Sequence, residues 1–206
     1  MASLSYEARV LGYLGYLEQA DAKAQQALTL AKNLAHPHSL AFAWHCAAEV
    51  HRQRADVQMS LKCAERTLEL SHEHGFPLWS ALAQIYRGWA LARLGRHEEA
   101  LATIPRGIAD YRAAGHEMAI PRFLVLLAEA HGHAGQAREG LGVLAEALVI
   151  VQRDGDRNSE AAELYRIRGE LLLALSAEHQ DEAEASLRRA VVIARRQQAK
   201  SPEPVS

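Results

Sequence analysis

The sequence predicts an all-α protein, a right-handed α-α superhelix built from five helical hairpins of about 40 residues each. Small residues recur in one frame, with Gly15, Ala55, Gly95 and Gly135 standing about forty positions apart. Proline or glycine interrupts the sequence between the units, and no segment shows the sustained alternation of apolar and polar residues that a strand requires. These three observations favour stacked helical hairpins over a sheet or a long coiled coil.

Apolar and small residues at helical spacing predict the first helix of each hairpin near 3–14, 39–53, 78–94, 121–134 and 159–175. The second helices are predicted near 18–34, 56–74, 97–114, 137–153 and 181–198. Small residues stand where the first helix should contact the second: Ala8, Ala48, Gly88, Ala128 and Gly169. They are needed there because two helices approach to about 8 Å only when small side chains meet.

The turns follow from residues that end or begin a helix. Glycine between the two helices of a hairpin predicts a left-handed residue after the first helix. Ser39 and Asp56 are predicted to cap the helices that follow them. Pro105 stands inside a predicted helix and predicts a kink or a break near Ile104. An insertion at 176–180 lengthens the last turn.

The repeats predict a single domain over residues 1–200, because each hairpin covers the apolar side of the next. The five units are 1–38, 39–77, 78–120, 121–158 and 159–200, and residues 201–206 are predicted to form a disordered tail. The last unit has no following repeat, and its apolar run 191–193 predicts self-association through this end or docking of a partner.

Composition and charge exclude several classes of protein. The 206 residues are 49% hydrophobic and carry a formal net charge of -2, which argues against a dedicated nucleic-acid binder. No apolar run approaches the roughly 18 residues of a transmembrane helix, and the N-terminus lacks the features of a secretion signal. Cys46 and Cys63 are too few for a disulfide scaffold, so we expect a cytoplasmic protein with buried reduced thiols, a redox pair being the alternative.

The pattern also resembles the tetratricopeptide repeat, or TPR, whose signature places an aromatic residue and small residues in the first helix and alanines in the second. The second, third and fifth units carry the likeness, at Trp44, Ala47, Ala48 and His51, at Gly88, Leu91, Gly95 and Ala100, and at Tyr165, Gly169, Leu172 and Ala190. The likeness covers about residues 1–200, with a period of about 40 in place of the usual 34 or so. It implies a solenoid whose first helices line a concave face.

Four segments are similar to the helical C-terminal region of large bacterial signalling proteins, which couple a cyclase, a kinase or a DNA-binding domain to an ATPase. These segments are 36–41, 75–79, 87–91 and 163–172. The likeness implies a regulatory or sensor module of bacterial signalling. The phosphate-binding pattern G-x-x-x-x-G-K-[ST] does not occur, so ATPase and cyclase activity are not carried over.

The resemblance to TPR arrays further implies which side chains face the groove, since fixed positions of the first helix line the concave face there. In this sequence those positions are Arg9, Tyr13, His45, Glu49, Arg52, Trp89, Arg93, Arg122, Glu129, His133, Arg166 and Glu170. Both signs of charge occur, and Trp89 among arginines suits a binding hot spot. An ordinary solvated face is the alternative interpretation.

Metal and catalytic sites find little support in the sequence. Histidines two positions apart, such as His36 and His38, diverge on a helix and could chelate a metal only in a loop, where no third ligand stands nearby. No nucleophile occupies a recognisable elbow, and no glycine-rich loop could cradle a phosphate. We therefore expect no metal, no cofactor and no enzymatic activity.

The sequence thus favours a non-catalytic scaffold that binds a protein or peptide on its concave face within bacterial signalling. The alternative is a regulatory domain of a cyclase- or ATPase-linked protein that senses a small molecule or signal peptide between its repeats. The net charge disfavours a nucleic-acid partner, and no association with a membrane is expected.

Overall fold

The computed structural model describes residues 1–154 and 159–197, and within these ranges the chain forms helices and no strand. The first helices of the hairpins are α1 (Ala2–Tyr13), α3 (Pro37–Gln53), α5 (Pro77–Arg93), α7 (Ile120–His133) and α9 (Ala161–Leu175). The second helices are α2 (Leu17–Leu34), α4 (Val57–His74), α6 (His97–Ala113), α8 (Ala137–Asp154) and α10 (Gln180–Arg196). The predicted all-α fold class is confirmed, and the helices begin and end within about two residues of their predicted positions.

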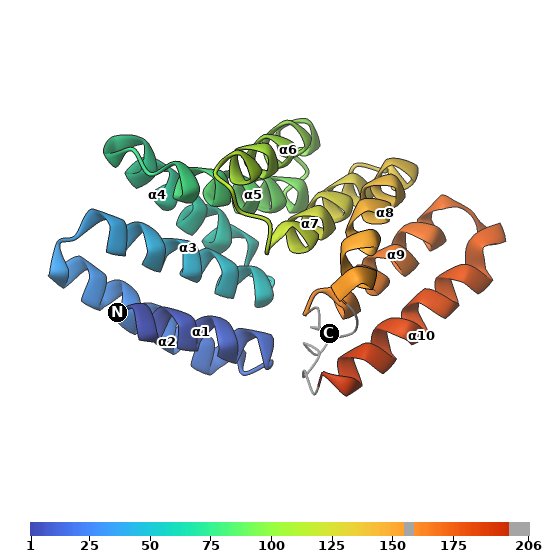
Figure 1. Ribbon diagram of the computed structural model, residues 1–206, viewed down its shortest axis with the longest axis horizontal. Coiled ribbons are helices and arrows are strands. Elements are labelled where there is room, and N and C mark those ends of the chain that lie inside the picture. The colour runs from blue at the N-terminus through green and yellow to red at the C-terminus, as the bar shows by residue number, and fades with distance from the viewer. Residues whose placement is uncertain (155–158, 198–206) are drawn as a thin grey trace.

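The helices form two layers that follow a curve (Figure 1). Each of the first helices contacts the next of its kind, so α1, α3, α5, α7 and α9 make a continuous inner layer. Each second helix packs on the first helix of its own hairpin and, up to α8, on the first helix of the following one, which makes an outer layer. Figure 1 shows this arc running from α1 and α2 through α5 and α6 to α9 and α10.

Close packing within the hairpins depends on the small residues of the inner layer. Ala8, Ala48 and Ala128 are fully buried, as their predicted contact positions require. A Cβ atom added to Gly88 would lie 2.4 Å from Cγ1 of Ile104 on α6. Such a distance is far shorter than van der Waals contact, so a glycine is needed where α5 and α6 approach each other.

The turn inside each of the first four hairpins has one left-handed residue at the same place in the repeat. Gly15, Gly95 and Gly135 have φ angles of 80°, 80° and 72°, as predicted. Ala55 holds this place in the second hairpin with a φ of 56°, although alanine rarely adopts this conformation. The repeat frame therefore fixes the backbone there even where the glycine is missing.

Of the two residues predicted to cap helices, Asp56 is confirmed and Ser39 is wrong. Asp56 caps α4 as predicted, since its carboxylate accepts a hydrogen bond from the backbone N–H of Met59 at 3.2 Å. Ser39 is not a cap, because α3 already begins at Pro37. The cap is instead the side chain of His36, whose Nδ1 accepts the backbone N–H of Ser39 at 3.3 Å.

The sequence predicts a kink or a break near Ile104, and the break is wrong. Helix α6 runs without interruption from His97 to Ala113 and contains Pro105. Pro105 is exposed on the outer layer, where its ring meets solvent instead of a neighbouring helix. The insertion predicted at 176–180 forms the short 3-10 helix η2 (Ala177–His179) before α10.

Three of the predicted segments lie partly or wholly outside the described residues. They are the tail 201–206, the end of the fourth unit at 155–158, and the end of the fifth unit at 198–200. Among the described helices, none combines the length and the apolar character that crossing a membrane would require.

Candidate binding groove

The twelve side chains predicted to face the groove all lie on the inner helices. Helices α1 and α3 carry Arg9, Tyr13, His45, Glu49 and Arg52. Helices α5, α7 and α9 carry Trp89, Arg93, Arg122, Glu129, His133, Arg166 and Glu170. The structure gathers most of them into three separate clusters of charged and aromatic groups instead of one continuous row.

The first cluster is centred on Glu49, whose side chain has no exposed surface. Its carboxylate forms ion pairs with Nε of Arg9 at 2.7 Å and with Nη1 of Arg122 at 2.7 Å. The hydroxyl of Tyr13 donates a third contact to Oε1 at 2.5 Å. Helices α1, α3 and α7 thus meet at one buried carboxylate.

Glu49 stays ionised in this surrounding. Burial opposes the charged form, but the neighbouring guanidinium groups of Arg122 and Arg9 outweigh it and lower the pKa of Glu49 to about 2. The same carboxylate raises the pKa of Arg9 and of Arg122 above the ordinary value despite their own burial. The cluster is therefore a fixed set of opposite charges at neutral pH.

Arg122 also reaches the start of α9. Its Nε donates to Oε1 of Glu160 at 2.9 Å and its Nη2 lies 2.8 Å from the same oxygen. Its guanidinium stands 4.9 Å from the centroid of the Tyr13 ring. A single side chain on α7 therefore links α1 and α3 to the residue that precedes α9, and sequence reasoning did not find Glu160.

The second cluster surrounds Glu129 on α7. Its carboxylate accepts a hydrogen bond from Nε1 of Trp89 at 2.9 Å and lies 3.4 Å from Nη1 of Arg93 and 3.6 Å from Nε2 of His133. The Trp89 ring is flanked by the guanidinium groups of Arg52 and Arg93, at 6.0 and 5.9 Å. Since Trp89 is only 3% exposed, its ring belongs to the core and offers little surface to a partner.

The third cluster lies on α9 alone. Arg166 binds Glu163, one turn earlier, through Nε at 2.8 Å and Nη2 at 2.7 Å, and its Nη1 contacts Glu170. This cluster is an intrahelical arrangement at the usual spacings of three and four. It gives the last inner helix a polar surface.

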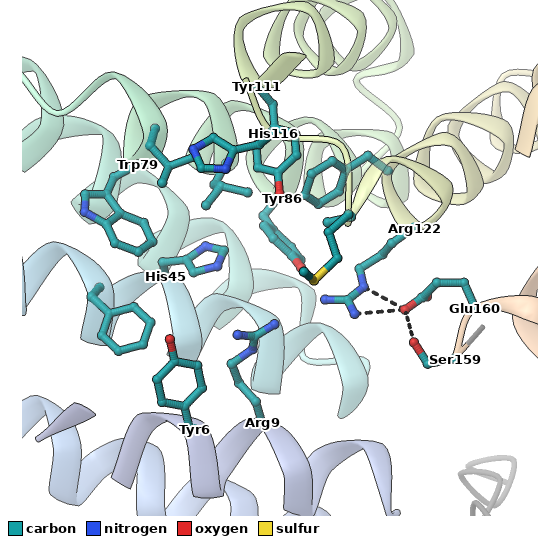
Figure 2. Close-up of a pocket in the computed structure, with 16 residues that line it drawn as sticks. Tyr6, Arg9, His45, Trp79, Tyr86, Tyr111, His116, Arg122, Ser159 and Glu160 are labelled. Carbon is teal, nitrogen blue, oxygen red and sulfur yellow. Dashed lines mark hydrogen bonds and ion pairs between the residues drawn. The ribbon is translucent and has the colours of Figure 1, made fainter. Parts of the chain in front are cut away.

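A cavity of about 520 Å³ opens between the inner helices on the side of their N-terminal turns. Only Arg9, His45 and Arg122 of the twelve predicted residues line it. Most of its wall consists of aromatic and apolar side chains that were not predicted: Tyr6, Phe42, Leu78, Trp79, Leu82, Tyr86, Tyr111, Met118, Ala119 and Phe123. Figure 2 shows Tyr6, Trp79, Tyr86 and Arg122 around this cavity.

Aromatic rings form a continuous run along the cavity across α1, α3 and α5. The ring centroids are 5.4 Å apart for Tyr6 and Phe42 and 5.4 Å apart for Phe42 and Trp79. The His45 ring lies 5.6 Å from Trp79 and 5.4 Å from Tyr86. We call these five side chains the aromatic run.

A signal for part of this run exists in the sequence. Tyr6, Phe42 and Trp79 each stand near the start of a first helix, a little less than one repeat apart. They drift through the forty-residue frame, so positions transferred from the TPR pattern missed them. A search for aromatic residues in the first two turns of the inner helices would have found all three.

The chemistry of the groove suits binding. The charged side chains near the cavity are held by one another, and among residues 1–154 and 159–197 no group of three side chains is arranged to hold a metal ion. Cys46 and Cys63 are both buried as free thiols, which agrees with the first of the two expectations for them. The groove presents aromatic surface next to guanidinium groups, a combination common in binding hot spots.

Comparison with known proteins shows which fold this is. No family model and no curated protein matches the sequence. Among solved structures, the chain is similar to the TPR-like repeats of a Podosopora anserina protein described as a kinesin light chain, with a TM-score of 0.59, 18% identity and 97% of each chain covered.

Two further structures have the same arrangement. BtubC (BKLC) from P. vanneervenii superimposes with a TM-score of 0.66 at 18% identity, covering 98% of this chain and 83% of that one. The apo form of RapI gives a TM-score of 0.65 at 13% identity, covering 95% of this chain and 82% of that one. The chain therefore has the fold of TPR-like repeat proteins, a helical solenoid of tandem hairpins.

Proposed function

We propose that this chain is a non-catalytic scaffold that binds a protein or peptide segment in its concave groove, as a regulatory module of bacterial cytoplasmic signalling. TPR-like folds generally bind such partners, and the likeness to BtubC and RapI supports a role of this kind. The similarity of segments 36–41, 75–79, 87–91 and 163–172 to bacterial signalling proteins supports the signalling context.

The observation that carries the proposal is the aromatic run. Rings in a groove offer large contact areas at a low cost in side-chain entropy, because each has few rotatable bonds. Tyr6 is exposed and Phe42 is half-buried, so both are accessible to a partner, whereas Tyr86 is buried in the core. A peptide laid across α1, α3 and α5 would cover these rings.

A selection experiment tests the proposal. The full chain is immobilised and used to select peptides from a random display library, and the enriched peptides are synthesised and their Kd values measured by fluorescence polarisation. Replacing Phe42→Ala should weaken binding at least about tenfold, as expected for an aromatic hot spot.

The control is Val149→Ala, which truncates an apolar side chain that is exposed on the outer helix α8. This variant should bind the selected peptides with an unchanged Kd. A selection that yields only peptides whose affinity ignores Phe42→Ala would show that the groove is not the binding site.

Self-association through the C-terminal repeat stays a prediction. The side chains of Leu173 on α9 and of Val191 and Val192 on α10 are exposed there. Sedimentation equilibrium of the wild type and of a Val191→Lys variant checks it, because the charged variant should be monomeric at concentrations where the wild type associates.

A further inference from the structure

We propose that the cavity between α1, α3, α5 and α7 binds a small aromatic carboxylic acid, with the carboxylate on Arg9 and the aromatic ring against the aromatic run. This ligand goes beyond the peptide partner proposed above, since a free small molecule would occupy the site. Four features of the described residues carry the inference: an available guanidinium, the charge of the lining, the aromatic wall and an unsatisfied histidine.

The first feature is the guanidinium of Arg9. Its Nε is turned to Glu49 at 2.7 Å, and the side chain as a whole keeps 26% of its surface exposed. Figure 2 shows its terminal nitrogens pointing toward the space between His45, Tyr86 and Arg122. Within residues 1–154 and 159–197 these nitrogens form no hydrogen bond or second ion pair, whereas Arg122 uses all three of its nitrogens on Glu49 and Glu160.

A guanidinium held in this way suits a carboxylate. Its two terminal NH₂ groups form a planar fork, and a carboxylate can accept two parallel hydrogen bonds from guanidinium nitrogens. Glu49 keeps Arg9 charged and fixes its orientation, so little side-chain freedom is lost when a ligand binds. The terminal nitrogens of Arg9 are therefore oriented hydrogen-bond donors for which the described residues provide no acceptor.

The second feature is the charge that a ligand would meet. Arg9 and Arg122 line the cavity, and Glu160 is the carboxylate among its lining residues. Glu49 forms an ion pair with Arg122 but has no exposed surface, so a ligand cannot contact it. Because Arg122 is already paired with Glu49 and Glu160, the terminal nitrogens of Arg9 are the charged groups left to meet a ligand, and they favour an acid over a cation.

The third feature is the wall of rings. Phe42, Trp79 and His45 stand at centroid distances of 5.4 and 5.6 Å, and the ring planes of each contacting pair are tilted. Aromatic groups pack well against such edges and faces, at centroid distances of about 4.5–7 Å. The volume of about 520 Å³ lies within the range of roughly 300–1,000 Å³ that small-molecule sites occupy.

The fourth feature is His45, which is 6% exposed and lines the cavity. Its Nδ1 is buried and has no hydrogen-bond partner among the described residues. Burial lowers the pKa of His45 to about 4, so the ring is neutral at pH 7 and Nδ1 can donate or accept according to tautomer. A polar group of a bound ligand would satisfy an atom that is otherwise costly to bury.

Isothermal titration calorimetry of the full chain tests the proposal with three probes. Indole-3-propionic acid carries both the ring and the carboxylate, its amide lacks the charge, and propionic acid lacks the ring. We expect the aromatic acid to bind, the amide to bind at least about tenfold more weakly, and propionic acid to show no heat of binding. Equal affinity for the acid and the amide, or no binding of the acid at millimolar concentration, would overturn the proposal.

A second arm asks whether the carboxylate belongs to a free acid or to the end of a peptide. The probe is a tripeptide that ends in tryptophan, with a free or an amidated C-terminus. Free indole-3-propionic acid should bind at least as tightly as the tripeptide acid. Binding of the tripeptide acid without binding of the free aromatic acid would contradict a small-molecule site.

Two variants locate the site. Arg9→Lys keeps the charge beside Glu49 but removes the planar fork of donors. It should raise the Kd of the aromatic acid at least about tenfold while the circular dichroism spectrum stays unchanged. Phe42→Leu should raise this Kd as well through loss of the ring contact. The control Arg188→Lys changes a mostly exposed arginine on α10 that pairs with Glu184, and it should leave the Kd unchanged.

These outcomes separate the two proposals. Peptides selected from a display library can depend on Phe42 even if no aromatic acid binds, which would leave the scaffold and remove the small-molecule site. An unchanged affinity of the acid in Arg9→Lys, in a protein with wild-type circular dichroism, would also remove that site. Binding of the acid together with failure of the peptide selection would remove the scaffold alone.

Discussion

Glu49 is a carboxylate without exposed surface that two arginines and a tyrosine hold in place. We expect Glu49→Gln to destabilise the protein by about 3–5 kcal/mol, because it removes the fully buried carboxylate that the partly buried guanidinium groups of Arg9 and Arg122 share. Urea denaturation at pH 7 measures this loss. Glu170→Gln is the control, since Glu170 is exposed and its ion pair with Arg166 should contribute less than about 1 kcal/mol. Similar losses in both variants would contradict the special role of Glu49.

The neutral His45 makes stability depend on pH. Its pKa is about 4 in the folded state and the ordinary value near 6.5 applies to the unfolded chain, so the unfolded state binds more protons between these values. The free energy of unfolding should therefore fall as the pH falls from 6.5 to 5, by about 1–2 kcal/mol from this residue. Urea denaturation of the wild type and of His45→Phe at a series of pH values measures the difference.

The His45→Phe variant should show a smaller slope over the same interval. Some slope should remain, because burial also lowers the pKa of His51. Identical slopes in the variant and the wild type would show that His45 does not titrate in the way its surroundings require.

At the scale of the elements, the contact between α5 and α6 is set by glycine. A Cβ on Gly107 would lie 2.7 Å from the backbone oxygen of Ala81 and 2.8 Å from Cγ1 of Ile85, so the helices would have to move apart. We expect Gly107→Ala to destabilise the protein by about 1–3 kcal/mol. The midpoint of thermal unfolding, followed by circular dichroism, measures the effect.

Gly142 on α8 is the matched control. An added Cβ there would meet nothing within 4 Å. Gly142→Ala should therefore stabilise the protein by up to about 1 kcal/mol, because alanine favours the helix more than glycine does. Destabilisation by both substitutions would show that helix–helix packing is not what Gly107 provides.

The helices could be predicted well because most local signals agree with the repeat. Small contact residues, turn glycines and apolar spacing all recur in one frame, so an error in one signal is corrected by the next unit. The predictions at Ser39 and Pro105 failed because each rested on the preference of a single residue type and not on its place in the repeat. The fold places Ser39 inside a helix that already has a cap, and it gives the ring of Pro105 an open surface.

At the scale of the whole molecule, the groove was harder to predict than the helices. The repeat frame put Arg9, Glu49 and Arg122 on inner helices, but it could not show that they share one carboxylate across 73 positions of sequence. That contact depends on the curvature of the array, which small rotations between successive hairpins add up to produce. The aromatic run was missed for a different reason, because its rings drift through the forty-residue frame and do not coincide with the positions transferred from the TPR pattern.

Arg122 leads to a prediction about unfolding as a whole. Two of its partners, Tyr13 on α1 and Glu49 on α3, lie on inner helices that are not neighbours of α7. The third, Glu160, lies directly before α9, which is a neighbour. Arg122→Ala should lower the urea m-value and allow α1 and α2 to exchange amide hydrogens sooner than the remaining helices. The control Arg93→Ala breaks a pair between adjacent inner helices and should leave the m-value unchanged.

Solenoids ordinarily melt piecewise, because each module touches only its neighbours and the ends fray first. The guanidinium of Arg122 contacts residues of the first, second and last hairpins, so unfolding of one end of the array removes contacts that stabilise the other end. The array should consequently come apart in a single concerted event, more in the manner of a globular protein than of a linear chain of modules.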